Sequence, residues 1–418
     1  MEKRVAFVTL GCKLNFSETS TFARQFEAAG YRRVSEGEAA DLYVINTCSV
    51  TEHADKKCRQ TIRKLHKCNP SALVVVTGCY AQLRPESIAG IEGVDAVIGA
   101  GKKGELFRIA DTLKEKRESP LLYPCNIGQV ESIFPAYSQG ERTRSFLKVQ
   151  DGCSYNCSYC TIPLARGRSR SLPIATLVAQ AEEIASKGVK EIVITGVNTG
   201  DFGRSTDESF LELLKALDNV EGIARYRISS IEPNLLKDEI LRFIASGSKF
   251  QPHFHIPLQS GCNSILAKMR RRYNCEMFEE KISMIRELVG DVFLGIDVIV
   301  GFPGEGEEEF ACTYEFLKER IRPAALHVFP YSRRADTDAA AMKNQVREGI
   351  KSERVETLVQ LSGKLHDEYC NRFKGTEQQV LFESAVRGGK MAGYTGNYIR
   401  VERPYDERLI GEIATVLL

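Results

Sequence analysis

The 418-residue sequence lacks several features that would place it in a simple class. No stretch approaches 18 uncharged apolar residues, which excludes a membrane-spanning helix. The opening residues, MEKRVAFVTLGCKLNF, hold only a short apolar run and no small-residue cleavage site, so we expect no signal peptide and a cytoplasmic protein. No repeat of solenoid period and no low-complexity tract is present, which argues against a repeat architecture.

The sequence also has a small net charge and few histidines. The 57 Lys and Arg residues almost balance the 55 Asp and Glu residues, which leaves a formal charge of +2. Attraction to nucleic acid must therefore come from local patches, because the overall field is weak. The six His residues do not alternate with Cys, and no window offers the four ligands that a closed zinc site needs.

Cysteine, by contrast, is abundant, with 13 residues. Disulfides are rare in cytosolic proteins, so cysteines in this number indicate metal, cluster or catalytic roles. The remaining composition, with 27% charged and 43% apolar residues, is that of an ordinary soluble globular protein. A chain of this length predicts two or three domains.

Residues 1–115 alternate short β-branched strands with helical segments. The predicted strands span residues 5–10, 41–46, 72–78 and 94–99, and the clearest helices span 18–30 and 53–68. Such alternation predicts an α/β domain built on a parallel sheet with helices on both faces. Residues 116–142 are rich in Pro, Gly and charge, and they are predicted to be a linker to the next domain.

Residues 143–365 hold a second series of strands and helices. Strands are predicted at 145–151, 191–196, 225–230, 254–258, 292–302 and 325–331. About six such repeats without a dinucleotide-binding glycine signature favour a complete or partial TIM-like barrel, with an open doubly wound sheet as the alternative. A polar helix is predicted at 345–373, and the short strands after it predict a small β-barrel-like module over 366–418.

A first set of cysteines, Cys12, Cys48 and Cys79, directly follows three of the predicted strands. The carboxyl ends of parallel strands lie on one edge of a sheet, so the fold should bring these thiols together. A single cysteine in such a place is commonly a buried apolar residue, and that interpretation stays open. Three in the same topological position favour ligation, and three thiolates without a fourth suit an iron–sulfur cluster with one open iron.

A second set forms a short run in the sequence DGCSYNCSYC, where Cys153, Cys157 and Cys160 follow the first barrel strand with C-x₃-C-x₂-C spacing. Three close thiolates can hold three corners of a cubane cluster whose fourth iron takes an outside ligand. The spacing resembles the radical S-adenosylmethionine (SAM) superfamily, in which the amino and carboxylate groups of SAM bind that iron. These three cysteines are therefore the predicted catalytic centre.

Polar residues follow the next three barrel strands, at the end of a barrel where catalytic sites form. The resemblance implies that they bind SAM, although TGVN stands here where the superfamily usually has a GGE-like motif. The aromatic residue before the third cysteine of the run is also similar to the superfamily. The residues expected to bind SAM are Tyr159, Thr195, Gly196, Asn198, Ser230, Glu232 and Gln259.

Motifs along nearly the whole chain resemble the methylthiotransferase family of radical SAM enzymes. They are LGCKLNFSET, NTCSVTEHAD, TGCYAQ, DGCSYNCSYCTIPLARGRSRS, HIPLQSG, IDVIVGFPGE and HVFPYSRR, and the tail with GYTGNYIRV is similar to the RNA-binding TRAM domain. Within the family, LGCK, NTCSVT and GCYAQ are most similar to the branch that acts on threonylcarbamoyl adenosine 37 of tRNA. The branch that acts on isopentenyl adenosine usually has GCQMN-like and NTCxVR-like motifs instead.

The resemblance implies a transferase that inserts a methylthio group at carbon-2 of that adenosine by radical chemistry. It implies two [4Fe-4S] clusters, one on each cysteine set, with the first carrying the sulfur, the second cleaving SAM, and a second SAM as methyl donor. It also implies tRNA, a flavodoxin- or ferredoxin-like reductant and a sulfur donor as partners, no membrane, and a monomer. The alternatives are methylthiolation of isopentenyl adenosine or of a ribosomal protein, and a non-catalytic iron–sulfur RNA-binding protein.

Basic residues predict where a tRNA is held. Between residues 141 and 170 six Lys and Arg stand against two acidic residues, and we expect Arg166 in this stretch to bind the substrate. Arg333 and Arg334 follow the last barrel strand, where an arginine fork would suit the threonylcarbamoyl carboxylate. A second basic group suits either phosphate contact or a solvated helix face; it consists of Lys268, Arg270, Arg271 and Arg272.

Overall fold

The computed structural model describes residues 2–418 and divides into two compact units. The first unit comprises residues up to 141 together with 146–155 and 160–172. The second comprises residues 142–145, 156–159 and 173–418. Within residues 2–418, no helix combines the length and the apolar character needed to cross a bilayer.

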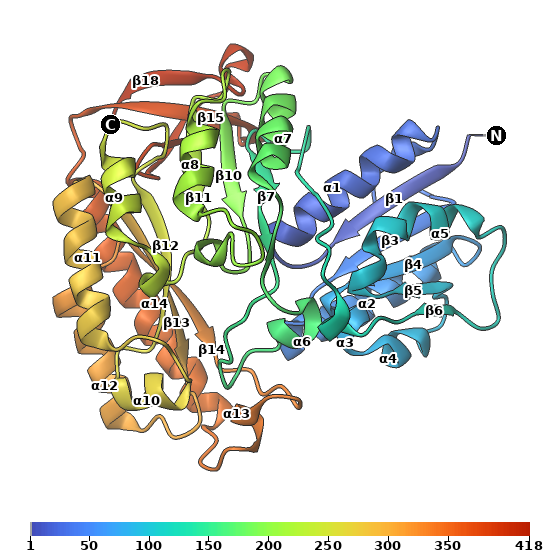
Figure 1. The fold of residues 1–418 in the computed structure, drawn as a ribbon, viewed down its shortest axis with the longest axis horizontal. Coiled ribbons are helices and arrows are strands. Elements are labelled where there is room, and N and C mark those ends of the chain that lie inside the picture. The colour runs from blue at the N-terminus through green and yellow to red at the C-terminus, as the bar shows by residue number, and fades with distance from the viewer. Residues whose placement is uncertain (1) are drawn as a thin grey trace. The chain divides into compact units, whose positions relative to one another are not determined.

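The first unit is built on a six-stranded parallel sheet of order β2-β1-β3-β4-β5-β6, drawn in blue to cyan in Figure 1. Its strands are β1 (Arg4–Thr9), β2 (Arg32–Val34), β3 (Leu42–Thr47), β4 (Leu73–Gly78), β5 (Ala96–Ile98) and β6 (Leu121–Tyr123). Its helices are α1 (Lys13–Ala28), α2 (Glu52–Cys68), α3 (Cys79–Leu83), α4 (Pro85–Ala89), η1 (Ala100–Glu105), α5 (Leu106–Thr112), η2 (Ile127–Gln129) and α6 (Ile162–Arg166). The predicted α/β domain is therefore present, and the segment 116–142, predicted as a linker, contributes β6 to the sheet.

Two apolar cores lie on opposite faces of this sheet. Phe22 of α1 packs in one core with Val44 of β3, and Ile62 of α2 packs in the other with Ile45. Successive residues of a strand point to opposite faces, so the neighbours Val44 and Ile45 serve the two cores in turn. The remaining elements near the second cysteine set are β7 (Ser145–Lys148), β8 (Gln150–Asp151) and β9 (Arg170–Ser171), and β8 pairs antiparallel with β9.

The second unit holds parallel strands that follow one another in chain order. They are β10 (Glu191–Thr195), β11 (Arg225–Ile228), β12 (His253–Gln259), β13 (Phe293–Val300) and β14 (Ala325–Pro330). A parallel bridge between Tyr226 and Phe250 joins β11 to the chain entering β12. The order does not reverse along the sheet, as it would in a doubly wound fold, so the structure supports the partial barrel.

Helices separate these strands and cover the outer face of the curved sheet that the strands form in Figure 1. They are α7 (Ile174–Ser186), η3 (Thr199–Asp201), α8 (Phe210–Asp218), η4 (Pro233–Leu235), α9 (Asp238–Ala245), α10 (Asn263–Lys268), α11 (Cys275–Val289), α12 (Glu307–Glu315) with the π-helical η5 (Phe316–Ile321), α13 (Asp338–Ala341) and α14 (Glu348–Asn371). The long α14 contacts two separate segments of its unit, the loop after β13 and the turn between β16 and β17. Near its start Arg354 Nη1 donates to Glu305 Oε1 at 2.8 Å, and near its end the Tyr369 hydroxyl donates to the Asn397 carbonyl at 3.0 Å.

The C-terminal tail is a four-stranded antiparallel sheet of order β17-β16-β15-β18. Its elements are β15 (Glu377–Arg387), β16 (Lys390–Thr395), β17 (Arg400–Pro404), η6 (Glu407–Leu409) and β18 (Ile413–Leu417). A turn with Tyr398 in the left-handed region (φ +63°) separates β16 from β17. The predicted small β module is present as this curled sheet.

Candidate functional site

The first cysteine set lies where the sequence predicts it. Cys12 follows β1, Cys48 follows β3, and Cys79 follows β4 as the first residue of α3. These three strands are neighbours in the sheet, so all three thiols lie at the edge of the sheet where the strands have their carboxyl ends. Cys12 is exposed, Cys48 is half-buried and Cys79 is buried, so the group opens to solvent at Cys12.

Two residues of the GCKLN motif bring the loops of this set together. Gly11 has φ +114°, and a Cβ there would lie 2.7 Å from the Cβ of Cys48 and 3.0 Å from its sulfur. Only glycine therefore allows the Cys12 loop to approach Cys48 so closely. The Asn15 amide donates to the carbonyls of Leu10 at 2.8 Å and Thr47 at 2.9 Å, which ties the ends of β1 and β3 together.

A buried network of charges lies beside these thiols in the first unit. Glu18 is fully buried and contacts Lys103 at 2.7 Å, Lys148 at 2.8 Å and Arg166 at 3.2 Å. Asp151 contacts Lys148 at 2.6 Å and Arg166 at 2.9 Å. Three cations face two carboxylates, so the network has a surplus of one positive charge. The signal in the sequence was a lysine in the middle of the apolar strand SFLKVQD.

Electrostatic effects connect this network to the thiols. Burial raises the pKa of the Cys48 thiol to about 12, and the neighbouring thiols of Cys79 and Cys12 act in the same direction. Burial also raises the pKa of Cys79, against the opposing effect of Arg166 and Lys103. Iron binding displaces such protons, and the surplus positive charge favours the anionic thiolates that result. The donor set and its surroundings therefore fit an iron–sulfur cluster.

Arg166, expected to bind the substrate, is part of this network. Its guanidinium is 2% exposed and donates from Nη1 to Asp151 and from Nη2 to Asn15 at 2.5 Å. The structure therefore places Arg166 against the loop that follows Cys12, and its predicted contact with the substrate stays a prediction.

The second cysteine set lies on a loop that crosses from one unit to the other. Cys153 and Cys160 belong to the first unit and Cys157 to the second. Cys153 Sγ accepts a hydrogen bond from the backbone N–H of Tyr155 at 3.4 Å, and Cys160 Sγ accepts one from Ile162 at 3.5 Å. Backbone N–H groups aimed at sulfur stabilise a thiolate or a cluster sulfur, so these two positions fit cluster ligands.

Within the first unit, the two cysteine sets are linked. The Thr161 hydroxyl, next to Cys160, donates to the carbonyl of Ser49, next to Cys48, at 3.5 Å. Arg166, five residues after Thr161, donates a hydrogen bond to Asn15, three residues after Cys12. The ends of both cysteine motifs therefore share one region of the first unit.

Arg271 is a residue that sequence reasoning left among surface basic groups. Its side chain is 3% exposed, and it contacts Cys157 Sγ at 3.1 Å, the Tyr159 hydroxyl at 3.4 Å and the carboxylate of Glu232. Burial raises the pKa of the Cys157 thiol, and Arg271 opposes that effect. Arg271 thus joins a predicted cluster ligand to two residues predicted to bind SAM, and no local pattern separates it from Arg270 and Arg272 in the sequence.

The other residues predicted to bind SAM lie at the carboxyl ends of three barrel strands. Thr195 ends β10, with Gly196 and Asn198 in the following loop; Ser230 and Glu232 follow β11; Gln259 ends β12. The Thr199 hydroxyl donates to the Ser230 carbonyl at 2.6 Å and ties the first two loops together. The barrel therefore places these residues at one edge of its sheet.

Gln259 is unusual in two ways. It is a non-glycine residue with φ +71°, at a point where the β12–β13 register shifts. Its side-chain Oε1 is buried, and it has no hydrogen-bond partner among residues 2–418. Strained backbone and an unsatisfied buried acceptor are typical of ligand sites, so Gln259 fits a contact with a donor group of SAM.

Arg333 and Arg334 follow β14 at the same end of the barrel strands. Arg333 Nε donates to the Ala340 carbonyl at 2.9 Å, which fixes the loop.

In the tail, Tyr394 and Tyr398 stack on each other at 4.8 Å, and Arg144 lies 5.0 Å from the first ring and 5.6 Å from the second. These tyrosines therefore pack within the second unit.

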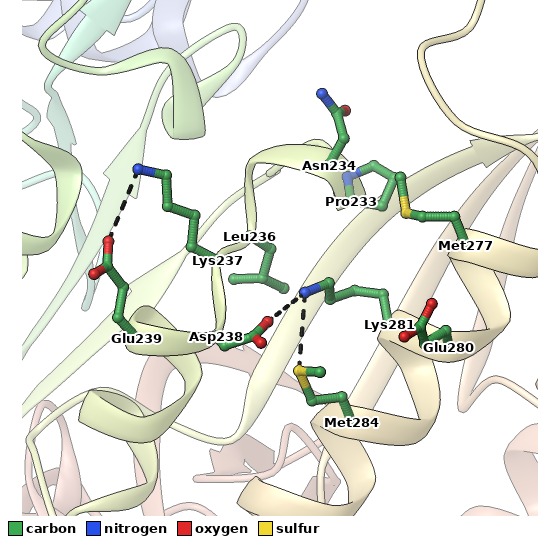
Figure 2. A pocket seen from close by; sticks show the side chains of 10 residues that line it. All are labelled: Pro233, Asn234, Leu236, Lys237, Asp238, Glu239, Met277, Glu280, Lys281 and Met284. Carbon is green, nitrogen blue, oxygen red and sulfur yellow. Dashed lines mark hydrogen bonds and ion pairs between the residues drawn. The ribbon is translucent and has the colours of Figure 1, made fainter.

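The second unit also has a cavity of about 680 Å³ (Figure 2). Residues of η4, α9 and α11 line it, and Lys281 bonds Asp238 across it at 2.8 Å. None of the predicted cluster or SAM ligands lines it.

Two sequence families match this chain. Residues 4–99 match the uncharacterized protein family UPF0004, and residues 147–317 match the Radical SAM superfamily. The threonylcarbamoyladenosine tRNA methylthiotransferase MtaB of Bacillus subtilis is 42% identical over 99% of this chain and 93% of its own length. The protein of the same name from Aquifex aeolicus is 40% identical, with coverage of 99% and 100%. The tRNA-2-methylthio-N(6)-dimethylallyladenosine synthase of Thermoanaerobacter pseudethanolicus is 33% identical, with coverage of 98% and 88%.

Among solved structures, the radical SAM methyltransferase TsrM from Kitasatospora setae has a TM-score of 0.55 at 16% identity, covering 81% of this chain and 74% of that one. This likeness supports the fold alone. The full-length sequence relatives establish more, and their superfamily uses a [4Fe-4S] cluster and SAM. The chain therefore belongs to the radical SAM methylthiotransferase family and is a transferase of that family.

Proposed function

We propose that this enzyme inserts a methylthio group at carbon-2 of threonylcarbamoyl adenosine at position 37 of tRNA, with a second SAM molecule as methyl donor. The observation that carries the proposal is the 42% identity, over 99% of this chain, to a relative named for threonylcarbamoyladenosine. The relative named for dimethylallyladenosine is 33% identical. The motifs LGCK, NTCSVT and GCYAQ favour the same branch.

The proposal includes two [4Fe-4S] clusters. When bound, the cluster on Cys153, Cys157 and Cys160 supplies the electron that cleaves SAM, and the cluster on Cys12, Cys48 and Cys79 supplies the sulfur. The buried network around Glu18 favours negative charge at the first set, since its cations outnumber its carboxylates. Arg271 and the N–H groups of Tyr155 and Ile162 hold the sulfurs of the second set.

The barrel residues bind and orient SAM in this proposal. Gln259 offers its buried acceptor to a donor group of SAM, and Glu232, held by Arg271, offers a carboxylate to the methionyl amine or the ribose. The backbone at Gly196 allows close approach of that ligand. Tyr159, Thr195, Asn198 and Ser230 complete the set.

The substrate side of the proposal rests on charge. An arginine at the end of β14, Arg333 or Arg334, would bind the threonylcarbamoyl carboxylate, because a guanidinium matches a carboxylate with two parallel hydrogen bonds. The partners are tRNA, a flavodoxin- or ferredoxin-like reductant and a sulfur donor, and we propose a cytoplasmic monomer.

The decisive experiment is mass spectrometry of tRNA nucleosides from cells with and without the gene. We expect only the methylthio form of threonylcarbamoyl adenosine to disappear. Wild-type protein should restore it, whereas Cys79→Ala and Cys157→Ala should not. The matched control Cys68→Ala changes an exposed cysteine at the end of α2 and should restore it fully.

Two other outcomes contradict the proposal in different ways. Loss of the methylthio group from isopentenyl adenosine instead would keep the chemistry and change the substrate branch. No change in either nucleoside would remove tRNA position 37 as the target and favour a protein substrate or a non-catalytic role.

A further inference from the structure

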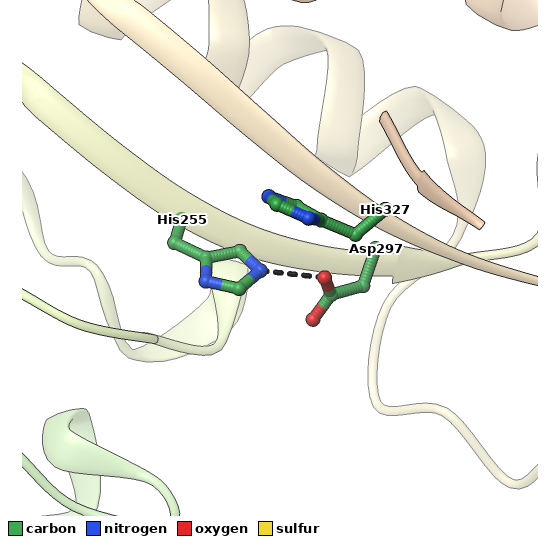
Figure 3. Close-up of side chains that lie close together, drawn as sticks. All are labelled: His255, Asp297 and His327. Carbon is green, nitrogen blue, oxygen red and sulfur yellow. Dashed lines mark hydrogen bonds and ion pairs between the residues drawn. The ribbon is translucent and has the colours of Figure 1, made fainter. Parts of the chain in front are cut away.

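Three side chains with metal-binding chemistry lie together on the barrel sheet, and none of them belongs to either cysteine set. They are His255 of β12, Asp297 of β13 and His327 of β14, shown in Figure 3. One ligand atom from each lies within 4.8 Å of the other two. The motifs HIPLQSG, IDVIVGFPGE and HVFPYSRR each contribute one of them, and the proposed radical chemistry uses none of the three.

The strand register explains why they meet. In the parallel ladder Asp297 is opposite His327, and His255 is opposite Gly295, two residues before Asp297. Residues two apart share a face of a sheet, so all three side chains project on one side. Their neighbours Ile256, Ile296 and Leu326 are buried on the other side.

Gly295 makes room for this arrangement. A Cβ at Gly295 would lie 3.4 Å from His327 Nε2, so the ring of His327 lies over the bare backbone of β13. Glycine in the interior of a strand weakens it and commonly marks a close approach of another group. The imidazole rings of His255 and His327 are consequently 4.8 Å apart between their centroids.

The charge of the group is suited to a cation. Asp297 is largely buried, with a side chain 19% exposed, and its ion pair is with His255, Nε2 to Oδ1 at 2.5 Å. No Lys or Arg of residues 2–418 forms an ion pair with it. A carboxylate that is largely removed from water requires a positively charged partner, and a bound cation would supply one.

We propose that His255, Asp297 and His327 bind one divalent first-row transition-metal cation, with a nitrogen from each histidine and an oxygen from the aspartate. Two imidazoles and one carboxylate are a recurrent ligand set for Fe²⁺, Mn²⁺ and Zn²⁺, and three protein ligands leave coordination positions open. Such positions accept oxygen ligands. If the proposed function holds, the threonylcarbamoyl carboxylate is one such oxygen ligand.

The test is an electron paramagnetic resonance titration of the cluster-loaded enzyme with Mn²⁺, without tRNA. Mn²⁺ is chosen because it prefers nitrogen and oxygen ligands over the free thiols of this chain. We expect one Mn²⁺ per chain to lose the signal of the free ion, and the bound ion to show ¹⁴N modulation from imidazole. His327→Ala and Asp297→Asn should weaken binding by about tenfold or more.

The control is His53→Ala, which removes an exposed histidine of α2 and should leave Mn²⁺ binding unchanged. Thermal unfolding of each variant separates loss of ligation from loss of folding, and His327→Gln provides a second variant of closer size. Binding without ¹⁴N modulation, binding equal in all variants, or no binding would each overturn the proposal. Because binding is measured without turnover, its failure is distinct from failure of the tRNA experiment.

Discussion

Gly11 determines how closely the loops of Cys12 and Cys48 can approach each other. Its left-handed backbone and the 2.7 Å that would separate a Cβ from Cys48 leave no room for any side chain. The neighbouring Asn15 holds the same two loops by hydrogen bonds to Leu10 and Thr47. These contacts hold the loops of Cys12 and Cys48 close together.

Gly11→Ala tests this point. Both the strained φ and the contact with Cys48 should reduce the iron bound at the first set, so iron per chain should fall by about half in a protein with two [4Fe-4S] clusters. Chemical iron analysis of the purified holoenzyme measures it. The matched control is Gly30→Ala, which has φ +85° but nothing within 4 Å of a Cβ, and it should lose about 1–2 kcal/mol of stability while keeping its iron. Equal iron in both variants would show that the approach of the loops does not matter.

At the scale of elements, the charged network joins α1, η1, β7, β8 and α6 in the first unit. Glu18 is its centre. Burial alone would raise the pKa of the Glu18 carboxyl, but Lys103, Lys148 and Arg166 together hold it below its ordinary value of 4.5. A carboxyl with a lowered folded pKa contributes stability that is complete above its unfolded pKa and is lost as pH falls through the folded value.

The enzyme should therefore lose unfolding free energy as the pH falls below about 4.5. Glu18→Gln, which leaves three buried cations with one carboxylate, should be less stable at neutral pH by about 3–5 kcal/mol and should show a shallower acid loss. Denaturant unfolding at a series of pH values measures both. Glu36→Gln removes an exposed carboxylate and should follow the wild type, and an unchanged acid profile in Glu18→Gln would contradict the argument.

The same scale shows what the sequence could predict. The strands β1, β3, β4 and β5 and the polar helix α14 were predictable, because long apolar runs and a clear helical pattern specify them. The edge strands β2 and β6 were not, since β2 is the short, mostly polar stretch Arg32–Val34 and β6 lies in a Pro-rich segment. The first cysteine set could be grouped from strand ends and the second from its C-x₃-C-x₂-C spacing, but the neighbours of Arg271 and Glu18 come from distant parts of the chain and depend on tertiary packing.

At the scale of the second unit, the tail and the barrel are one packed body. Arg227 of β11 donates to the carbonyls of Thr395 at 2.7 Å and Gly396 at 2.8 Å, and to Glu191 at 2.8 Å. Its guanidinium also lies 4.9 Å from the ring of Tyr398. The buried Arg227 therefore links the barrel strand β11 to the tail sheet.

Arg227→Met should remove these bonds and leave Glu191 short of a partner, at a cost of about 3 kcal/mol. We expect limited proteolysis to cut the tail, in residues 376–418, faster than the barrel, and mass spectrometry of the fragments identifies the cut sites. Arg400→Met, on the exposed side of the tail, should be cut like the wild type. Equal resistance of the Arg227 variant would mean that other contacts hold the tail.

The helix α14 also determines which segments relatives of this enzyme could exchange. It is a rod of about 36 Å, and its first turns hold the Glu305 loop at the carboxyl end of β13 while its last turn holds the tail at Asn397. A chimaera that swaps only the tail sheet would change the segment that Tyr369 contacts, and one that swaps only the barrel would change the loop that Arg354 contacts. A graft of the tail from another family member should therefore begin before residue 348 and carry the matching strand-end loop with it.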